Sequence, residues 1–118
     1  SVGFTVWDHS DRRTIYLLNT DWASDQDQRP ATFIYKGKKF PVVVRRYHIE
    51  TIHCADGLAV MPASNTTDIL SVCKKENGWV VKVQTTGNDV VQCMNAVTGK
   101  VEPIKFDEPG VHEVFVNE

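Results

Sequence analysis

The sequence lacks any hydrophobic run long enough to span a membrane as a helix, which takes about 18 or more apolar residues. It also lacks an excess of one charge, because 13 Lys and Arg residues stand against 15 Asp and Glu residues. A nucleic-acid-binding domain normally carries a basic excess, and a disordered chain combines strong net charge with low hydrophobicity. We therefore expect no membrane span and no nucleic-acid partner. With 118 residues, 42% of them hydrophobic, the chain is expected to form one folded domain over residues 1–118.

The motifs of the common catalytic and cofactor sites are also missing. The sequence contains no GxGxxG or Walker-type phosphate loop, no GxSxG nucleophile elbow and no HExxH metal motif. Its four histidines, His9, His48, His53 and His112, are scattered along the chain. The sequence therefore predicts no catalytic residue, no metal site and no cofactor within this chain. It begins at Ser1 rather than Met, which we interpret as a piece processed or excised from a longer protein.

Cysteine is scarce, and its spacing does not fit a zinc site. Cys54, Cys73 and Cys93 are widely spaced, form no CxxC pair and are odd in number. All three lie among apolar or β-prone neighbours, so we expect buried free thiols that pack as small hydrophobic side chains. One disulfide between two of them, with one thiol left over, is the alternative.

Short β-prone segments separated by Gly, Pro, Asn and Asp make up almost the whole chain. They indicate an all-β fold, an antiparallel β-sandwich of immunoglobulin-like or glycosidase C-terminal type, with a small barrel as the competing closure. The predicted strands are Gly3–Trp7, Thr14–Asn19, Ala31–Tyr35, Lys39–Arg46, His48–His53, Leu58–Met61, Asp68–Lys74, Trp79–Thr85, Asp89–Asn95, Lys100–Phe106 and Val111–Val116.

Turn residues predict how these strands pair. Gly37-Lys38 and Asn77-Gly78 each separate two strands by about two residues, as in tight hairpins. Together with Gly87-Asn88, such turns predict that residues 68–106 form one antiparallel meander. Pro41 has no N–H to donate, which favours an edge position for its strand.

The alternation of apolar and polar residues predicts which strand faces are buried. Residues 79–84 alternate and should have one solvated face, whereas residues 14–19 carry apolar side chains on both faces and should form a central strand. The expected core residues are Leu17, Val43, Ile69, Val81, Val83 and Val91, packed around Trp79.

One long polar segment, residues 20–30, has no strand periodicity and places Trp22 among charged and amide side chains. An indole plane beside carboxylates and a guanidinium is the composition of a sugar-binding surface, because sugar rings have apolar faces and polar rims. Of the two readings, we favour the one in which Trp22 covers the core as a lid, and a glycan-stacking surface is the alternative. If the chain binds a polysaccharide, the predicted glycan-binding residues are Asp21, Trp22, Asp25, Asp27 and Arg29.

Several segments resemble the C-terminal β-sandwich found behind the catalytic domains of bacterial carbohydrate-active enzymes. Thr14–Trp22, a strand that runs into Asn-x-Asp-Trp, is similar to a strand and loop of these domains, and Pro30-Ala31-Thr32 follows it. Met94–Lys100 resembles a D-x-x-T-G-[KE] hairpin near their end, with Asn95 in place of the Asp, and Glu108–Val114 resembles their final strand.

The resemblance implies a non-catalytic accessory domain that packs on, or assists, the catalytic domain of a glycoside hydrolase or polysaccharide lyase. It also implies a secreted bacterial protein, periplasmic or extracellular, whose catalytic residues lie outside this chain. Two alternatives remain open at this point: a carbohydrate-binding module that holds glycan through the Trp22 segment, and an immunoglobulin-like protein-interaction domain.

Overall fold

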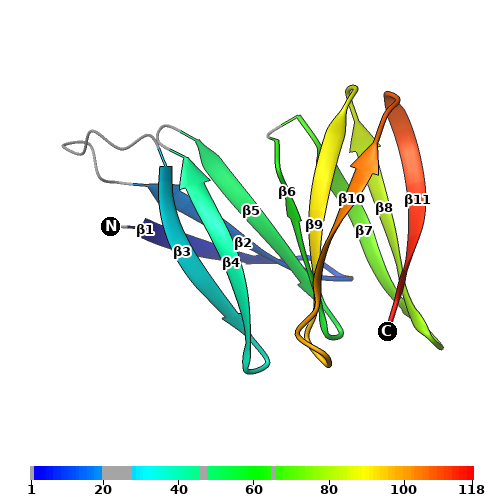
Figure 1. The fold of residues 1–118 in the computed structure, drawn as a ribbon, viewed down its shortest axis with the longest axis horizontal. Helices are drawn as coiled ribbons and strands as arrows, with labels where there is room; N and C mark the ends of the chain where they lie inside the picture. Colours follow the sequence, from blue (N-terminus) through cyan, green and yellow to red (C-terminus); the bar gives the residue numbers. More distant parts are fainter. Residues whose placement is uncertain (1, 20–27, 46–47, 65) are drawn as a thin grey trace.

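A computed structural model describes residues 2–19, 28–45, 48–64 and 66–118. All regular structure within these residues is β-strand, and every strand pairing is antiparallel, which confirms the predicted fold class (Figure 1). Each of the eleven predicted strands is present within a few residues of its expected bounds. The strands are β1 (Val2–Asp8), β2 (Arg13–Asn19), β3 (Gln28–Tyr35), β4 (Lys38–Arg45), β5 (Ile49–Ala55), β6 (Leu58–Pro62), β7 (Asp68–Lys75), β8 (Gly78–Thr85), β9 (Asp89–Asn95), β10 (Val101–Phe106) and β11 (Gly110–Asn117).

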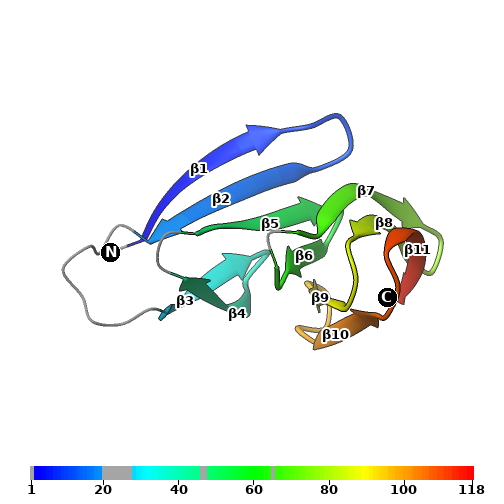
Figure 2. The same cartoon turned by 90° about the horizontal axis from the view of Figure 1, so that it is seen from above.

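The strands form three sheets that pack as layers. A six-stranded sheet has the order β1-β2-β5-β6-β9-β10, a three-stranded sheet has the order β11-β8-β7, and β3 pairs with β4. Figure 2 shows the six-stranded sheet between the β3–β4 hairpin on one side and the three-stranded sheet on the other. Its central strands are therefore covered on both faces, and their side chains alternate between two cores.

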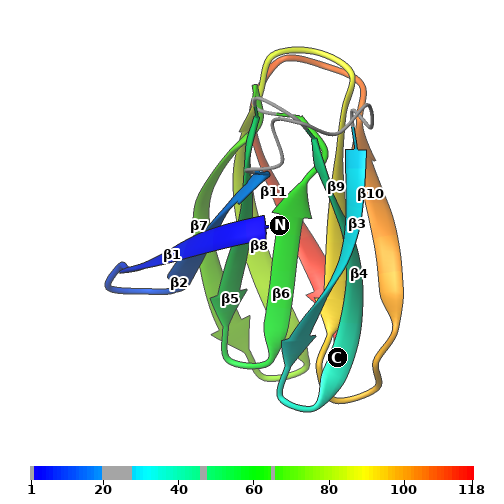
Figure 3. The ribbon, with the colours of Figure 1, turned by 90° about the vertical axis from the view of Figure 1, so that its left-hand side faces the viewer.

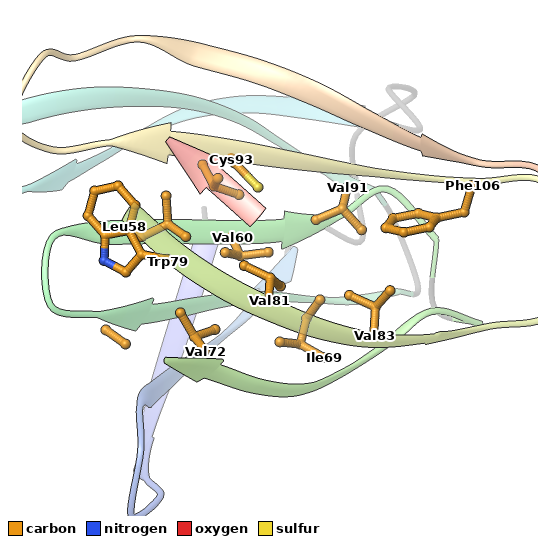
Figure 4. Packing of buried hydrophobic residues seen from close by; sticks show 12 residues of the cluster. Leu58, Val60, Ile69, Val72, Trp79, Val81, Val83, Val91, Cys93 and Phe106 are labelled. Carbon is orange, nitrogen blue, oxygen red and sulfur yellow. The ribbon is translucent and has the colours of Figure 1, made fainter. Parts of the chain in front are cut away.

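The first core lies between the six-stranded and the three-stranded sheets (Figure 4). Trp79 of β8 is its largest fully buried side chain, and Val81 and Val83 follow it at the same face. The Trp79 indole N–H donates to the carbonyl oxygen of Asp56 at 3.1 Å, so the polar atom of this buried ring is satisfied. The predicted burial of Ile69, Trp79, Val81, Val83 and Val91 is confirmed.

The second core lies between the six-stranded sheet and the β3–β4 hairpin. Phe40, Val42 and Val44 of β4 point into it, and Leu17 of β2 is buried there as predicted. The prediction for Val43 is wrong, because this side chain is 43% exposed. Residues 42–44 are three valines in a row, and the inward position of Phe40 sets the alternation that turns Val43 to the outside.

The predicted meander over residues 68–106 is also wrong. β7 pairs with β8 and β9 pairs with β10, but β8 belongs to the three-stranded sheet and β9 to the six-stranded sheet. The turn between β8 and β9 therefore crosses from one layer to the other, and the Thr86 N–H donates to the Asp89 carboxylate at 3.1 Å within it. A corner between sheets and a hairpin use similar turn residues, which is why the local pattern did not distinguish them.

The β3–β4 hairpin turns one residue earlier than predicted. Tyr35 pairs with Lys38, so the two turn residues are Lys36 and Gly37, with φ angles of 50° and 79°. Positive φ at both positions is typical of the type I′ turn that suits the twist of a two-residue hairpin. Pro41 lies in an edge strand, as its missing N–H predicted.

Two of the three cysteines are buried as expected, and all three are free thiols. Cys54 and Cys93 contribute to the cores, but Cys73 of β7 is exposed, which corrects the prediction for this residue. The register of β7 on β8 shifts between Ile69 and Ser71. Because this irregularity changes the alternation, Ile69 and Val72 both point inward and Cys73 points outward.

Candidate functional site

Most of the predicted glycan-binding residues lie outside the described residues. This applies to Asp21, Trp22, Asp25 and Asp27. Arg29 is described, and it lies in β3, half-buried and paired with Val44 of β4. The prediction for the Trp22 segment therefore stays a prediction.

The β1–β2 hairpin is the part of the described chain with the most exposed apolar surface. Figure 3 shows it projecting from the body formed by the other strands. Residues that pair directly in an antiparallel ladder point to the same face, and Phe4 pairs with Leu17 while Val6 pairs with Ile15. We call these four residues the inner face. The outer face consists of Thr5, Trp7, Tyr16 and Leu18.

The inner face forms the floor of an open groove of about 500 Å³ beside the β3–β4 hairpin. Ala31, Phe33 and Tyr35 of β3 form its wall. Phe4 is 73% exposed and Val6 is 42% exposed, because β3 and β4 cover Ile15 and Leu17 of β2 but do not reach over β1. Among the described residues that line the groove, Arg13 is the one with a charge, and its guanidinium pairs with the Asp8 carboxylate at 2.7 Å.

The outer face is exposed as well, which corrects the prediction that β2 is covered on both sides. Tyr16 and Leu18 are partly exposed, and Trp7 is 62% exposed. Leu18 pairs with the exposed Ile49 of β5, so the apolar surface continues onto the next strand. β2 is thus covered at its inner face, where Ile15 and Leu17 are buried, and exposed at Tyr16 and Leu18 of its outer face. β1 is exposed on both faces, through Phe4 and Val6 on one and Trp7 on the other.

A partly buried polar cluster attaches the turn of this hairpin to the rest of the molecule. Arg12 donates from Nε to His53 Nδ1 at 3.1 Å and from Nη2 to the Ile69 carbonyl oxygen at 2.9 Å. Asp11 accepts the Val72 N–H at 3.1 Å. Residues of the β1–β2 turn thus bind β5 and β7 together, which holds the hairpin at a defined angle to the body.

The hydrogen bonds of His53 determine which of its two ring nitrogens carries the proton. Because the Arg12 Nε–H is always a donor, Nδ1 of His53 must accept, and the ring proton resides on Nε2 and donates to Thr51 Oγ1 at 3.2 Å. Burial, together with the nearby positive charge of Arg12, lowers the pKa of His53 to about 3. His53 is therefore neutral at physiological pH, and it belongs to the polar cluster that attaches the β1–β2 turn to β5 and β7.

The two buried cysteines, Cys54 and Cys93, offer no reactive thiolate. Burial raises the pKa of the Cys54 thiol to about 12, and the same cause raises that of Cys93 to about 12, so neither is a thiolate at neutral pH. Cys54 borders the groove, while His53 before it joins the polar cluster at the opposite face of β5. Among the described residues, no three His, Cys, Asp or Glu side chains lie close enough together to hold a metal ion.

The sequence signal for this site was present in residues 2–7, an uncharged stretch with apolar residues at alternate positions. It did not distinguish a covered strand from an exposed one. Within the described residues, no helix is long and apolar enough to cross a membrane. Comparison with known proteins found no match to a family model, to a curated protein sequence or to a solved structure.

Proposed function

We propose that this chain is a non-catalytic accessory domain that docks on a neighbouring protein module through the inner face of the β1–β2 hairpin. The observation that carries the proposal is the exposure of Phe4 and Val6, which line an open apolar groove. Fully burying such a side chain contributes roughly 1.5–3 kcal/mol of favourable free energy. Both residues would therefore stabilise a complex in which a partner surface covers the groove. The resemblance to accessory β-sandwiches makes the catalytic module of a carbohydrate-active enzyme the proposed neighbour.

The composition of the groove supports a protein partner over a small ligand. Small-molecule sites combine an apolar wall with several polar groups that converge on the ligand and orient it. Here the charged lining residue, Arg13, already pairs with Asp8, and the Tyr35 hydroxyl accepts the Gly57 N–H at 3.1 Å. An open apolar groove whose charged residue and tyrosine hydroxyl are already engaged suits the apolar contact of one domain with another.

The test is a double substitution in the longer protein that carries both modules. Phe4→Ser with Val6→Ser is expected to lower the unfolding temperature of the catalytic module by at least about 2 °C, because the contact between modules is weakened. Differential scanning calorimetry measures this shift. The matched control is Phe115→Ser with Val111→Ser, which removes a similarly exposed Phe and Val from the edge strand β11.

If both double variants shift the catalytic module equally, or neither does, the inner face is not the docking surface. The isolated chain gives a second readout, because the variants should change its own stability by no more than about 0.5 kcal/mol as surface substitutions. As a non-catalytic domain, the isolated chain is also expected to degrade no polysaccharide.

The outer face favours carbohydrate binding as a second candidate function. It presents Trp7 and Tyr16 on one sheet face, where Thr5 pairs directly with Tyr16 and lies two residues before Trp7 on β1. Stacking of a sugar ring on such aromatic planes, with few hydrogen bonds, corresponds to about 4–5 kcal/mol, or a Kd near the millimolar range.

Titration of the chain with a panel of polysaccharides, followed by tryptophan fluorescence, tests this second candidate. If the outer face is the site, Trp7→Ala abolishes binding and Trp22→Ala leaves it unchanged. Loss of binding in Trp22→Ala alone would instead support the segment predicted from the sequence. Absence of binding to every glycan would leave docking as the better account.

A further inference from the structure

The outer edge of β1 is unusual because it lacks the features that keep sheet edges from pairing with other strands. Proteins protect such edges with charged residues, prolines or bulges. Residues 2–7 of β1 include no charged residue and no proline. The register of β1 on β2 is unbroken, so this pair of strands contains no bulge. The other described edge strands carry such features: Pro103 and Lys105 in β10, Lys74 and the irregular register in β7, Glu113 in β11, Pro30 in β3 and Pro41 in β4.

The peptide groups at this edge are placed for pairing. The His9 N–H donates to the Arg12 carbonyl oxygen at 2.8 Å, which makes these two residues a hydrogen-bonded pair at the end of the hairpin. Hydrogen-bonded and non-hydrogen-bonded pairs alternate along an antiparallel ladder. Counting back through the register, the N–H and C=O groups of Phe4 and Val6 point away from β2, toward the open edge.

We infer that a second copy of this chain pairs with this edge, β1 to β1 and antiparallel, about a two-fold axis through Thr5. This register joins the outward peptide groups of Phe4 in one copy to those of Val6 in the other, as hydrogen bonding requires. It also places Trp7 of one copy opposite Gly3 of the other, where an aromatic ring can cover the backbone of an edge glycine. The two six-stranded sheets thereby become one continuous sheet.

The charges of β1 allow this symmetric contact. The one charged residue of the strand, Asp8, lies three residues from the two-fold axis, so the two Asp8 residues would be about 20 Å apart along the strands at ~3.4 Å per residue. Charges separated by more than about 8 Å are largely screened at physiological ionic strength, and each Asp8 is also paired with its own Arg13.

The free edge of β1 is accessible to a second copy of the chain. The short length of this edge indicates a weak dimer. β1 is the outermost strand of the six-stranded sheet, and its free edge faces away from the β3–β4 hairpin and the three-stranded sheet, so a second copy can approach this edge (Figure 2). Seven residues on each side form an interface well below the roughly 20–30 residues a side of standard specific complexes, which is the size of a weak, transient contact. We expect a reversible dimer with a dissociation constant on the order of 100 μM. Both inner faces would lie on the same side of the joined sheet, which leaves the proposed docking surface accessible.

Sedimentation equilibrium of the chain tests the inference with a charge-swap pair at Thr5, an exposed residue that pairs with itself across the proposed axis. Thr5→Lys and Thr5→Glu should each raise the dissociation constant at least about fivefold, because like charges then face each other directly. An equimolar mixture of the two variants should restore association to the wild-type level or better. Thr86→Lys, in an exposed turn remote from β1, is the control and should leave the constant unchanged.

A cross-linking measurement gives an independent readout. In the proposed register Thr5 and its symmetry mate form a non-hydrogen-bonded pair, in which the side chains lie closest. Thr5→Cys, in a Cys73→Ser background that removes the exposed native thiol, should form a disulfide-linked dimer under oxidised glutathione, whereas Thr86→Cys in the same background should not. A wild-type chain that stays monomeric at millimolar concentration, or a dimer unaffected by both Thr5 charges, would overturn the inference.

Discussion

Replacing Trp79 with alanine is expected to lower the free energy of unfolding by about 3–5 kcal/mol, the range for truncating a large buried aromatic residue. Trp79 is fully buried in the first core, and its indole N–H holds the Asp56 carbonyl in the turn between β5 and β6. The substitution therefore leaves a cavity and also an unsatisfied carbonyl. Chemical denaturation at neutral pH measures the loss.

Trp7→Ala is the matched control, because it removes the same side chain from an exposed position. We expect this variant to stay within about 0.5 kcal/mol of the wild type, as is usual for surface substitutions. Equal effects of the two substitutions would show that β1 is not exposed as described or that the inward alternation of β8 is wrong.

Acidification is expected to destabilise the protein through His53. Its pKa is about 3 in the folded chain, against an ordinary value of 6.5. Between these two values the unfolded chain binds a proton at this residue and the folded chain does not, so stability falls as the pH falls from about 6.5 toward 3. The slope from this one group is at most about 1.4 kcal/mol per pH unit. The folded state resists protonation because the ring is buried and Nδ1 faces the Arg12 guanidinium.

Comparison with His53→Asn separates this contribution from other titrating groups. The amide oxygen of asparagine can accept the Arg12 Nε–H, but the side chain binds no proton in this range. Denaturation curves of the two proteins between pH 7 and pH 4 should therefore converge as the pH falls, with the wild type losing stability faster. Parallel pH dependences would contradict the assignment of His53 as a neutral member of the cluster.

Below about pH 4 the carboxylate of Asp11 adds a loss in the same direction. Burial alone would raise its pKa, but the Val72 N–H and the Arg12 charge together lower it below the ordinary 3.8. A group with a lowered pKa stabilises the folded state above its ordinary pKa, and that stabilisation is lost as it is protonated. Both residues belong to the attachment of the β1–β2 hairpin, so acid should loosen this hairpin from β7.

A glycan-binding site at the Trp22 segment is the functional hypothesis that follows from the sequence. It rests on Trp22 because an aromatic residue stands out in a polar segment, and this hypothesis stays untested because the segment lies outside the described residues. The exposed Trp7 and Phe4 did not stand out, because an alternating apolar strand has the same pattern whether or not another layer covers it. Their exposure follows from where the neighbouring sheets end.

The sequence by itself determined where the strands lie, because alternation and turn residues act over a few neighbouring positions. Asp56-Gly57 is a further example, since this pair adopts positive φ at both positions and closes the hairpin between β5 and β6. Only the tertiary structure decided that β8 and β9 belong to different sheets, that Val43 faces outward and that β1 is left uncovered. These features depend on which strands, far apart in the sequence, pack against one another. The free energy of that packing comes from contacts between distant residues, which the alternation within one strand does not reveal.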